Sequence, residues 1–322
     1  MIYALSIKEA KYSRSMVQET FFSTHTENIS IGIANINSIA GNLENNKQKI
    51  IKALDYFSKA GANLVIFPEY CLSGYFWEPE NNCRSYMETA CMDHMKDWLD
   101  DVIESYINDP LKYIVLNGLL MNSRVPGKYF NTSIVLDHTH RYFEKERSYR
   151  KTFIPGFEEP YVTSGKNDDL VLETQWGNFG FLTCYDICFP QFAQNLVCEK
   201  GADALIVNAV WRKQGEREYK GLNISESFYY QRQWNTTIPA IALQNQVWVM
   251  AANAVGSHSI DGLNFCGCSG IWAPSGINQI KGSDIKEELI ILHNVDIIGE
   301  NMKERMEYDY IEDFRDIKSS DQ

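Results

Sequence analysis

The chain has 322 residues, enough for one large α/β domain or two ordinary ones, and its 44% of hydrophobic residues can fill a sizeable core. Its 30 Lys and Arg residues against 42 Asp and Glu residues give a formal charge of −12. This charge disfavours binding to nucleic-acid phosphates. No apolar run reaches the roughly 18–20 residues of a membrane span, so we expect no membrane partner either.

The two ends of the chain differ in character from its middle. Residues 1–27 are mixed and polar, and we predict that they form an extension or a lid before a domain at 28–300; a charged tail follows at 301–322. The N-terminus has too short an apolar stretch for a secretory signal and lacks a small-residue cleavage site. Eight cysteines are too few for a dense disulfide framework in a chain of this length. A cytoplasmic protein is therefore expected.

Strands and helices alternate through the middle of the chain. The unbroken apolar run at 63–70 is typical of a strand buried on both faces. Several consecutive strands lack a helix between them, which favours one domain of mixed sheets with helices outside. The predicted strands lie at 30–37, 63–70, 113–121, 129–137, 180–186, 202–211, 246–256, 270–276 and 287–297, and helices are predicted at about 43–60, 84–108, after Pro190 and at 224–244.

Glu69 ends a strongly apolar strand in the segment VIFPEYCLSGY. An unpaired charge at such a place is costly, so the carboxylate is either paired or functional. Desolvation there can raise the pKa of a carboxyl group towards neutrality and make it a general base. A salt-bridged structural glutamate is an equal alternative when Glu69 is taken alone.

Cys184 and Lys151 are the other two candidate chemical residues. In GFLTCYDICFP a strand runs into a tight turn and then a helix, which exposes Cys184 and leaves backbone N–H groups for an oxyanion, as in a nucleophile elbow. A buried inert thiol is the alternative. Lys151, in SYRKTFIPGFEEPY, is a surface charge unless it lies beside that thiol, where a cation lowers the thiol pKa and stabilises an oxyanion.

Taken together, these segments resemble the nitrilase superfamily of carbon–nitrogen hydrolases, in its amidase- and carbamoylase-like branch. FPEYCLSGY, SYRKTFIP and GFLTCYDICFPQ match the family's glutamate, lysine and cysteine segments in order, and GADALIVNAVW, ALQNQVWVMAANAVG and FCGCSGIWAPSG resemble later strands, so the likeness spans about 29–297. It implies the catalytic residues Glu69, Lys151 and Cys184. It also implies a four-layer αββα sandwich and a homodimer or larger homo-oligomer.

The resemblance further implies a second glutamate that positions substrate and lysine. Glu158 and Glu159 are both candidates, and Glu158 is preferred because it lies seven residues from both Lys151 and Gly165. The backbone N–H of Tyr185 would join Lys151 in holding the oxyanion. Position 188 is often Arg and position 191 commonly Glu in relatives, but here they are Cys and Gln, which weakens any transfer of substrate preference.

The function expected from this resemblance is hydrolysis of a linear amide through a thioester on Cys184, with release of ammonia or an amine. An N-carbamoyl amide hydrolase is the next choice, followed by a nitrilase or an amide-forming acyltransferase. The chemistry implies no organic cofactor. The aromatic residues Tyr75, Phe76, Trp77 and Trp211 are candidate pocket residues, with core packing an equal alternative. Arg212 is a candidate for reading a substrate carboxylate, although an exposed arginine is the more ordinary explanation.

Three rival interpretations are weaker. A metal site is disfavoured because Cys184/Cys188 and Cys266/Cys268 lack C-x₂-C spacing, and the only close histidines are at 138 and 140. A Cys–His protease is disfavoured because no signature of that class surrounds Cys184. A non-enzymatic scaffold on the same fold is disfavoured by the presence of all three candidate catalytic residues.

Overall fold

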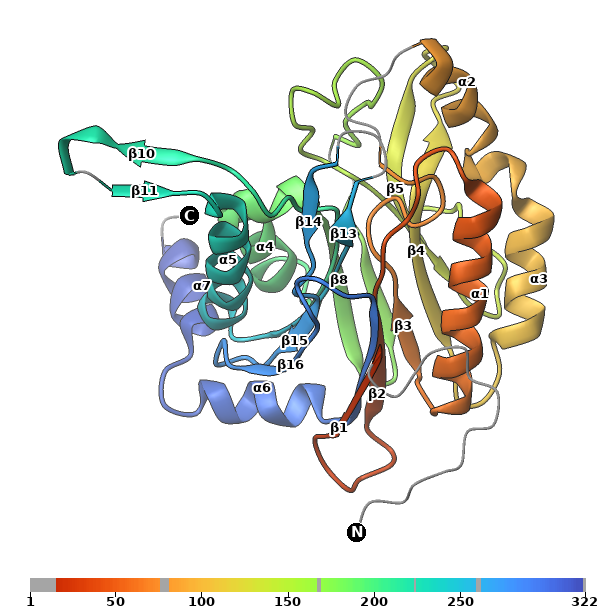
Figure 1. The fold of residues 1–322 in the computed structure, drawn as a ribbon. Coiled ribbons are helices and arrows are strands. Elements are labelled where there is room, and N and C mark those ends of the chain that lie inside the picture. The colour runs from red at the N-terminus through yellow and green to blue at the C-terminus, as the bar shows by residue number, and fades with distance from the viewer. Residues whose placement is uncertain (1–15, 76–80, 167–168, 223, 259–261, 321–322) are drawn as a thin grey trace.

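The computed structural model describes residues 16–75, 81–166, 169–222, 224–258 and 262–320, and two sheets packed face to face form its centre (Figure 1). The first sheet contains, in spatial order, β1 (Val17–Phe21), β17 (Glu288–Val295), β2 (Ile29–Asn35), β3 (Leu64–Ile66), β4 (Tyr113–Met121), β5 (Tyr129–Leu136) and β6 (Ser148–Arg150). The second contains β16 (Asn278–Lys281), β15 (Gly270–Trp272), β12 (Trp248–Asn253), β9 (Ala204–Ala209), β8 (Gly177–Thr183) and β7 (Val171–Thr174).

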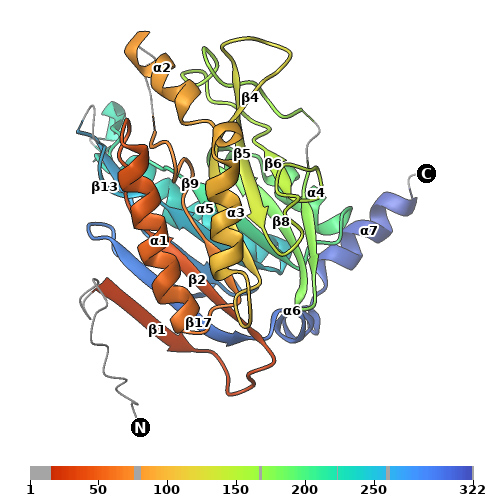
Figure 2. The same ribbon diagram turned by 90° about the vertical axis from the view of Figure 1, so that its right-hand side faces the viewer.

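Helices cover the outer face of each sheet. The helices α1 (Leu43–Lys59) and α3 (Lys96–Tyr106) lie on the first sheet, and α4 (Pro190–Cys198) and α5 (Tyr229–Asn245) lie on the second (Figures 1 and 2). The layers therefore run helix, sheet, sheet, helix, and the predicted αββα sandwich is confirmed. The remaining elements are α2 (Asn81–Thr89), α6 (Ile297–Arg305), α7 (Tyr310–Ser320), β10 (Arg217–Tyr219), β11 (Ile224–Glu226), β13 (Val255–Ser257), β14 (Asn264–Cys266) and short 3₁₀ helices at Met92–His94, Cys184–Cys188 and Lys220–Leu222.

The two faces of each central strand pack into different layers. Successive side chains of a strand point to opposite sides, so Leu64 and Ile66 of β3 enter the core between the sheets while Val65 packs under the helices of the first sheet. All three are at most 1% exposed. The same arrangement in β2 and β9 explains why their sequences, ISIGIAN and ALIVNA, are mostly apolar, since both faces of these strands exclude water.

Parallel pairing brings the ends of several strands to one end of the sandwich. The strands β2, β3 and β4 are parallel in the first sheet, and β8, β9 and β12 are parallel in the second. Polar residues therefore follow neighbouring strands at a shared edge. A hydrogen bond from the backbone N–H of Val210, just after β9, to Glu69, just after β3, joins the edges of the two sheets.

The strand predicted at 180–186 begins and ends three residues earlier than expected, at Gly177–Thr183. Strand β8 ends at Thr183, and Cys184–Cys188 form a 3₁₀ helix instead. The backbone turns at Cys184, whose φ of +48° lies in the left-handed region. A reciprocal capping pair between Thr183 and Asp186 stabilises this turn.

The helix predicted at 224–244 begins late, because its first residues belong to a hairpin. Strands β10 and β11 pair in antiparallel fashion and project from the body of the molecule (Figure 1), and we call them the β10–β11 arm. Helix α5 then starts at Tyr229. The predicted helix at 84–108 is divided as well, into α2 and α3 with a 3₁₀ turn between them.

The described parts of the two chain ends form regular secondary structure. Within the predicted extension, β1 pairs in parallel with β17 at the edge of the first sheet, so this segment is held by backbone hydrogen bonds without burying an apolar face. The charged tail forms α6 and α7, which are anchored by Asn301 and Ile311, 2% and 5% exposed. Within the described ranges, every helix is too short or too polar to cross a membrane.

Candidate active site

Glu69 lies three residues after the end of β3 and is 1% exposed. Its Oε1 accepts hydrogen bonds from Lys151 Nζ at 2.9 Å and from Asn131 Nδ2 at 2.6 Å, and its Oε2 accepts one from the backbone N–H of Val210 at 3.0 Å. A carboxylate offers about four acceptor positions, so one is left for a further proton donor. The neighbouring Tyr70 has a φ of +52°, and its N–H donates to Asn117 Oδ1 at 2.7 Å, which fixes the turn that presents Glu69.

Lys151 is fully buried between two carboxylates. Besides Glu69, its Nζ donates to the two carboxylate oxygens of Glu158 at 3.3 and 3.2 Å. Burial by itself would lower the pKa of Lys151, but Glu158 and Glu69 outweigh it and raise this pKa well above its usual value. Lys151 is therefore a cation at neutral pH, and Glu69, Lys151 and Glu158 form what we call the buried charge cluster.

Glu158 is the glutamate that contacts the lysine. It is 1% exposed, and its Oε1 accepts a hydrogen bond from the Tyr75 hydroxyl at 2.8 Å. Burial raises the pKa of Glu158, and Lys151 opposes this shift. Glu159 is exposed, and its backbone carbonyl accepts a hydrogen bond from the side chain of Lys128. The structure thus places Glu158, and not Glu159, beside Lys151.

Cys184 is the first residue of the 3₁₀ helix that follows β8. Burial and the negative charge of Glu69 raise the pKa of its thiol well above the usual value, although Lys151 opposes them. Glu69 and Lys151, which both belong to the buried charge cluster, thus shift the pKa of this thiol in opposite directions. The thiol is protonated at neutral pH, so it needs a base before it can act as a nucleophile.

Asp186 was not singled out from the sequence, yet it holds the turn around Cys184 in place. Its Oδ2 accepts hydrogen bonds from the backbone N–H of Thr183 at 2.8 Å and from the Tyr149 hydroxyl at 2.7 Å. Its Oδ1 accepts one from the backbone N–H of Phe153 at 2.9 Å. Asp186 thereby ties the cysteine turn to the segment that carries Lys151. Burial raises the pKa of Asp186 to about 6.

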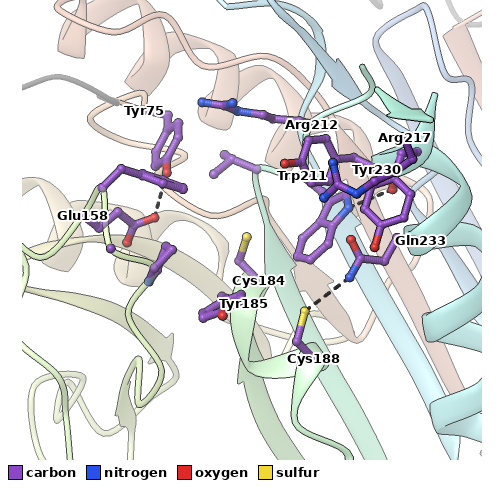
Figure 3. A pocket seen from close by; sticks show the side chains of 15 residues that line it. Tyr75, Glu158, Cys184, Tyr185, Cys188, Trp211, Arg212, Arg217, Tyr230 and Gln233 are labelled. Atoms are coloured by element: carbon purple, nitrogen blue, oxygen red, sulfur yellow. Dashed lines mark hydrogen bonds between the residues drawn. The ribbon is translucent and has the colours of Figure 1, made fainter. Parts of the chain in front are cut away.

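A cavity of about 400 Å³ opens beside these groups (Figure 3). Cys184 and Glu158 reach its wall, whereas Glu69 and Lys151 are buried behind it. Of the aromatic residues predicted for the pocket, Tyr75 and Trp211 line the cavity, and Phe76 and Trp77 lie outside the described residues; Tyr185, predicted as an oxyanion donor, and Arg212 line it as well. The complete lining is Tyr75, Pro155, Gly156, Phe157, Glu158, Cys184, Tyr185, Cys188, Val210, Trp211, Arg212, Arg217, Tyr229, Tyr230 and Gln233.

Several residues that line the cavity were not predicted from the sequence, because they lie in or next to the segment where the hairpin replaces the start of the predicted helix. Tyr229, Tyr230 and Gln233 belong to its first turns, and Arg217 comes from the β10–β11 arm. The predicted strand-to-helix patterns contain no signal for these positions. Asn131 and the Val210 N–H were missed for another reason, since they reach Glu69 only through the pairing of strands far apart in sequence.

The described residues contain no cluster of three or more His, Cys, Asp and Glu side chains that could hold a metal ion. No histidine is among the described residues that line the cavity. The polar side chains that line the cavity thus carry two thiols, one carboxylate, two guanidinium groups, hydroxyls and an amide, with the Glu69 carboxylate and the Lys151 ammonium buried behind them. This set suits acyl transfer with a sulfur nucleophile and a carboxylate base.

Comparison with known proteins gives consistent relatives. A probable nitrilase from Schizosaccharomyces pombe is 26% identical over 261 residues, covering 80% of this chain and 84% of the relative. A CN-hydrolase superfamily protein from Xanthomonas campestris, with an arsenic adduct in its active site, superposes with a TM-score of 0.71 at 18% identity, covering 89% of this chain and 97% of the other.

A mutant amidase from Nesterenkonia sp. AN1, with acrylamide added at its active-site cysteine, has a TM-score of 0.66 at 19% identity and covers 87% of this chain and 97% of its own. At these identities the two structural likenesses concern the fold. The family model for carbon–nitrogen hydrolases matches residues 30–297, which is most of the sequence. The chain belongs to the carbon–nitrogen hydrolase family, within the nitrilase superfamily.

Proposed function

We propose that this protein is a cysteine amidase that hydrolyses a linear amide through a thioester on Cys184 and releases ammonia or an amine. The observation that carries this proposal is the buried charge cluster, which lies behind the wall of the cavity that Cys184 reaches. Amidase and nitrilase relatives support the same class of reaction.

Acylation begins with a neutral thiol. As the sulfur attacks the amide carbonyl carbon, the thiol proton passes to Glu69, and the carbonyl π electrons move to the oxygen. Lys151 Nζ and the backbone N–H of Tyr185 stabilise that oxyanion. The carbon–nitrogen bond then breaks, Glu69 returns the proton to the leaving nitrogen, and the acyl group stays on Cys184 as a thioester.

Deacylation repeats the sequence with water. Glu69 takes a proton from a water molecule as its oxygen attacks the thioester carbonyl, and the same two donors hold the second oxyanion. The carbon–sulfur bond breaks, and the sulfur recovers the proton from Glu69. The products are a carboxylic acid and the original thiol, so each turnover consumes one water and leaves the protein unchanged.

Glu158 has a positioning role in this scheme. Its contact with Lys151 adds a second carboxylate to the one supplied by Glu69, and Tyr75 in turn holds Glu158. Because two carboxylates keep Lys151 charged, the cation stays available for the oxyanion throughout the cycle. An N-carbamoyl amide, a nitrile or acyl transfer to an amine would use the same sulfur chemistry, and these are the alternatives that substrate tests must separate.

The test is ammonia release from linear amides, ureido acids and nitriles, combined with intact-mass detection of the acyl-enzyme after rapid quenching. We expect turnover to be greatest with amides, together with a mass increase equal to the acyl group. Cys184→Ala should abolish both signals, whereas Glu69→Gln should suppress turnover because the base is lost.

Cys188→Ala is the matched control, because this second thiol lines the same cavity four residues further along the 3₁₀ helix. It should keep the acyl-enzyme signal. Near wild-type turnover in Cys184→Ala, or an acyl group mapped by peptide digestion to another residue, would refute the proposal.

A further inference from the structure

The wall of the cavity combines six aromatic residues with two arginines. In the view of Figure 3, Tyr75 and Glu158 lie to one side of Cys184, and Arg217 and Tyr230 lie to the other. A substrate amide at the sulfur therefore has room to extend toward Arg217. This end of the cavity is distinct from the buried charge cluster, which serves the reacting atoms.

The guanidinium of Arg217 is held in place by stacking. Its Cζ lies 4.1 Å from the centre of the Tyr229 ring and 5.9 Å from that of Tyr230, and its Nη1 donates to the backbone carbonyl of Glu216 at 2.8 Å. Stacking uses the face of the guanidinium plane, so the remaining N–H groups on its edge stay available to an acceptor.

No carboxylate of the described residues lies at ion-pair distance from Arg217. Glu226, on the facing strand of the arm, pairs with Arg232 at 2.6 Å instead. Lys213, near the base of the arm, pairs with Asp284 at 2.8 Å. Arg217 is thus an exposed cation at the mouth of the cavity, in contact with two aromatic rings and without an ion pair to another described residue.

The charge of the whole molecule makes this cation significant. With a formal charge of −12, the protein repels small anions at long range, so an anionic substrate needs local positive charge to bind. Arg212, whose guanidinium lies 5.6 Å from the Phe157 ring centre, adds a second cation at the same wall. Guanidinium groups match the two oxygens of a carboxylate better than any other side chain does.

We propose that the substrate is an amide that also bears a carboxylate at the end away from the scissile bond, and that Arg217 of the β10–β11 arm binds this carboxylate. The proposal rests on the amidase function and deepens it. The aromatic rings between Cys184 and Arg217 would pack on the carbon chain that links the two groups, so both the length and the terminal charge of that chain determine specificity.

Two linked measurements test this assignment. The first compares kcat/KM for monoamides of linear dicarboxylic acids, from succinic to suberic acid, with those for neutral alkyl amides and terminal-amino amides of equal length. We expect the carboxylate series to be preferred by about 10- to 100-fold, the worth of a charge-assisted hydrogen bond, with the amino series poorest. Arg217→Met should remove the preference, so that carboxylate and neutral amides of equal length have similar kcat/KM, while Arg217→Lys retains part of it.

The second measurement titrates the same monoamides into Cys184→Ala, with and without Arg217→Met, by calorimetry. It reports carboxylate binding without turnover, so it separates this proposal from the amidase function. Arg232→Met is the matched control, because it removes another arginine beside the arm that does not line the cavity. Equal kcat/KM for charged and neutral amides, or carboxylate affinity that Arg217→Met leaves unchanged, would overturn the assignment even if amides are hydrolysed.

Discussion

At the scale of single residues, the candidate site contains buried charged groups that are paired and hydrogen-bonded. Lys151 contacts two carboxylates, and Glu69 accepts three hydrogen bonds. A buried ion is tolerated when it is paired and its hydrogen bonds are satisfied. In the proposed mechanism, the hydrogen bonds of the buried charge cluster hold its donors in place before negative charge develops on the substrate.

Asp186 gives a pH-dependent test of the turn around Cys184. Because burial raises its pKa from 3.8 to about 6, the native state binds this proton more tightly than the unfolded chain does. The contribution of Asp186 to stability is then greatest below about pH 4 and falls as the pH rises through about 6. Asp186→Asn cannot titrate, so the free energy of unfolding of the wild type relative to this variant should fall by up to about 3 kcal/mol across that range.

Urea unfolding of both proteins at pH 4, 5, 6 and 7 checks this expectation. Since the other ionisable groups are shared, their titration cancels in the difference between the two curves. Curves that run parallel from pH 4 to 7 would show that Asp186 has the same pKa in the native and unfolded chains.

The residues that could be named from the sequence are those whose motif is local. Glu69, Lys151, Glu158 and Cys184 each lie in a short, recognisable segment, and the structure places all four together. Asp186 lies only two residues beyond Cys184, but its partners Tyr149 and Phe153 come from the lysine segment. No local pattern indicates that these two segments meet, because their contact depends on the pairing of whole strands.

At the scale of elements, the strands were easier to predict than the arm. Both faces of β3 and β9 are buried, so β3 is apolar throughout and Asn208 is the one polar residue of β9. Strands β10 and β11 have no such pattern; the residues of β10 are all exposed, and the arm is stabilised by cross-strand backbone bonds and by aromatic contacts at its base. The sequence pattern therefore predicted the α5 helix to begin about one turn too early, and it did not predict the arm.

Gly215 tests how the base of the arm shapes the cavity. A methyl group there would lie 2.5 Å from ring atoms of Tyr230, which lines the cavity. Gly215→Ala should therefore displace that ring, cost about 1–3 kcal/mol of stability as overpacking does, and raise KM. Steady-state kinetics on the best amide and chemical unfolding measure the two effects.

Gly221→Ala is the control for this change, since its added methyl group has no atom within 4 Å and its backbone lies on the same arm segment. It should resemble the wild type in both assays. If Gly215→Ala behaved like Gly221→Ala, the arm would be free to shift without affecting Tyr230 or the cavity.

At the scale of the whole molecule, the layer between the sheets positions the chemistry, because the candidate residues follow strands of both sheets. The αββα order followed from family resemblance and is confirmed, whereas composition alone indicated only mixed sheets with helices outside. The expectation of a homodimer or larger homo-oligomer stays a prediction, which sedimentation equilibrium can measure.

Phe181 tests the importance of that central layer. It is fully buried on β8, in the core between the sheets and three residues before Cys184. Phe181→Ala should lower the free energy of unfolding by about 3–5 kcal/mol, because it removes apolar contacts and leaves a cavity. Phe314→Ala, on α7 with 37% of the residue exposed, should cost about 1 kcal/mol or less. Equal losses in urea unfolding would show that the stability does not reside between the sheets.

The raised pKa of Cys184 has a consequence for the life of the protein between turnovers. Peroxides and alkylating agents attack thiolates far faster than thiols, so a sulfur that keeps its proton is a poor target for both. We therefore expect Cys184 to react slowly with peroxide when no substrate is bound, and in the proposed mechanism the thiol loses its proton only as the sulfur attacks a bound amide.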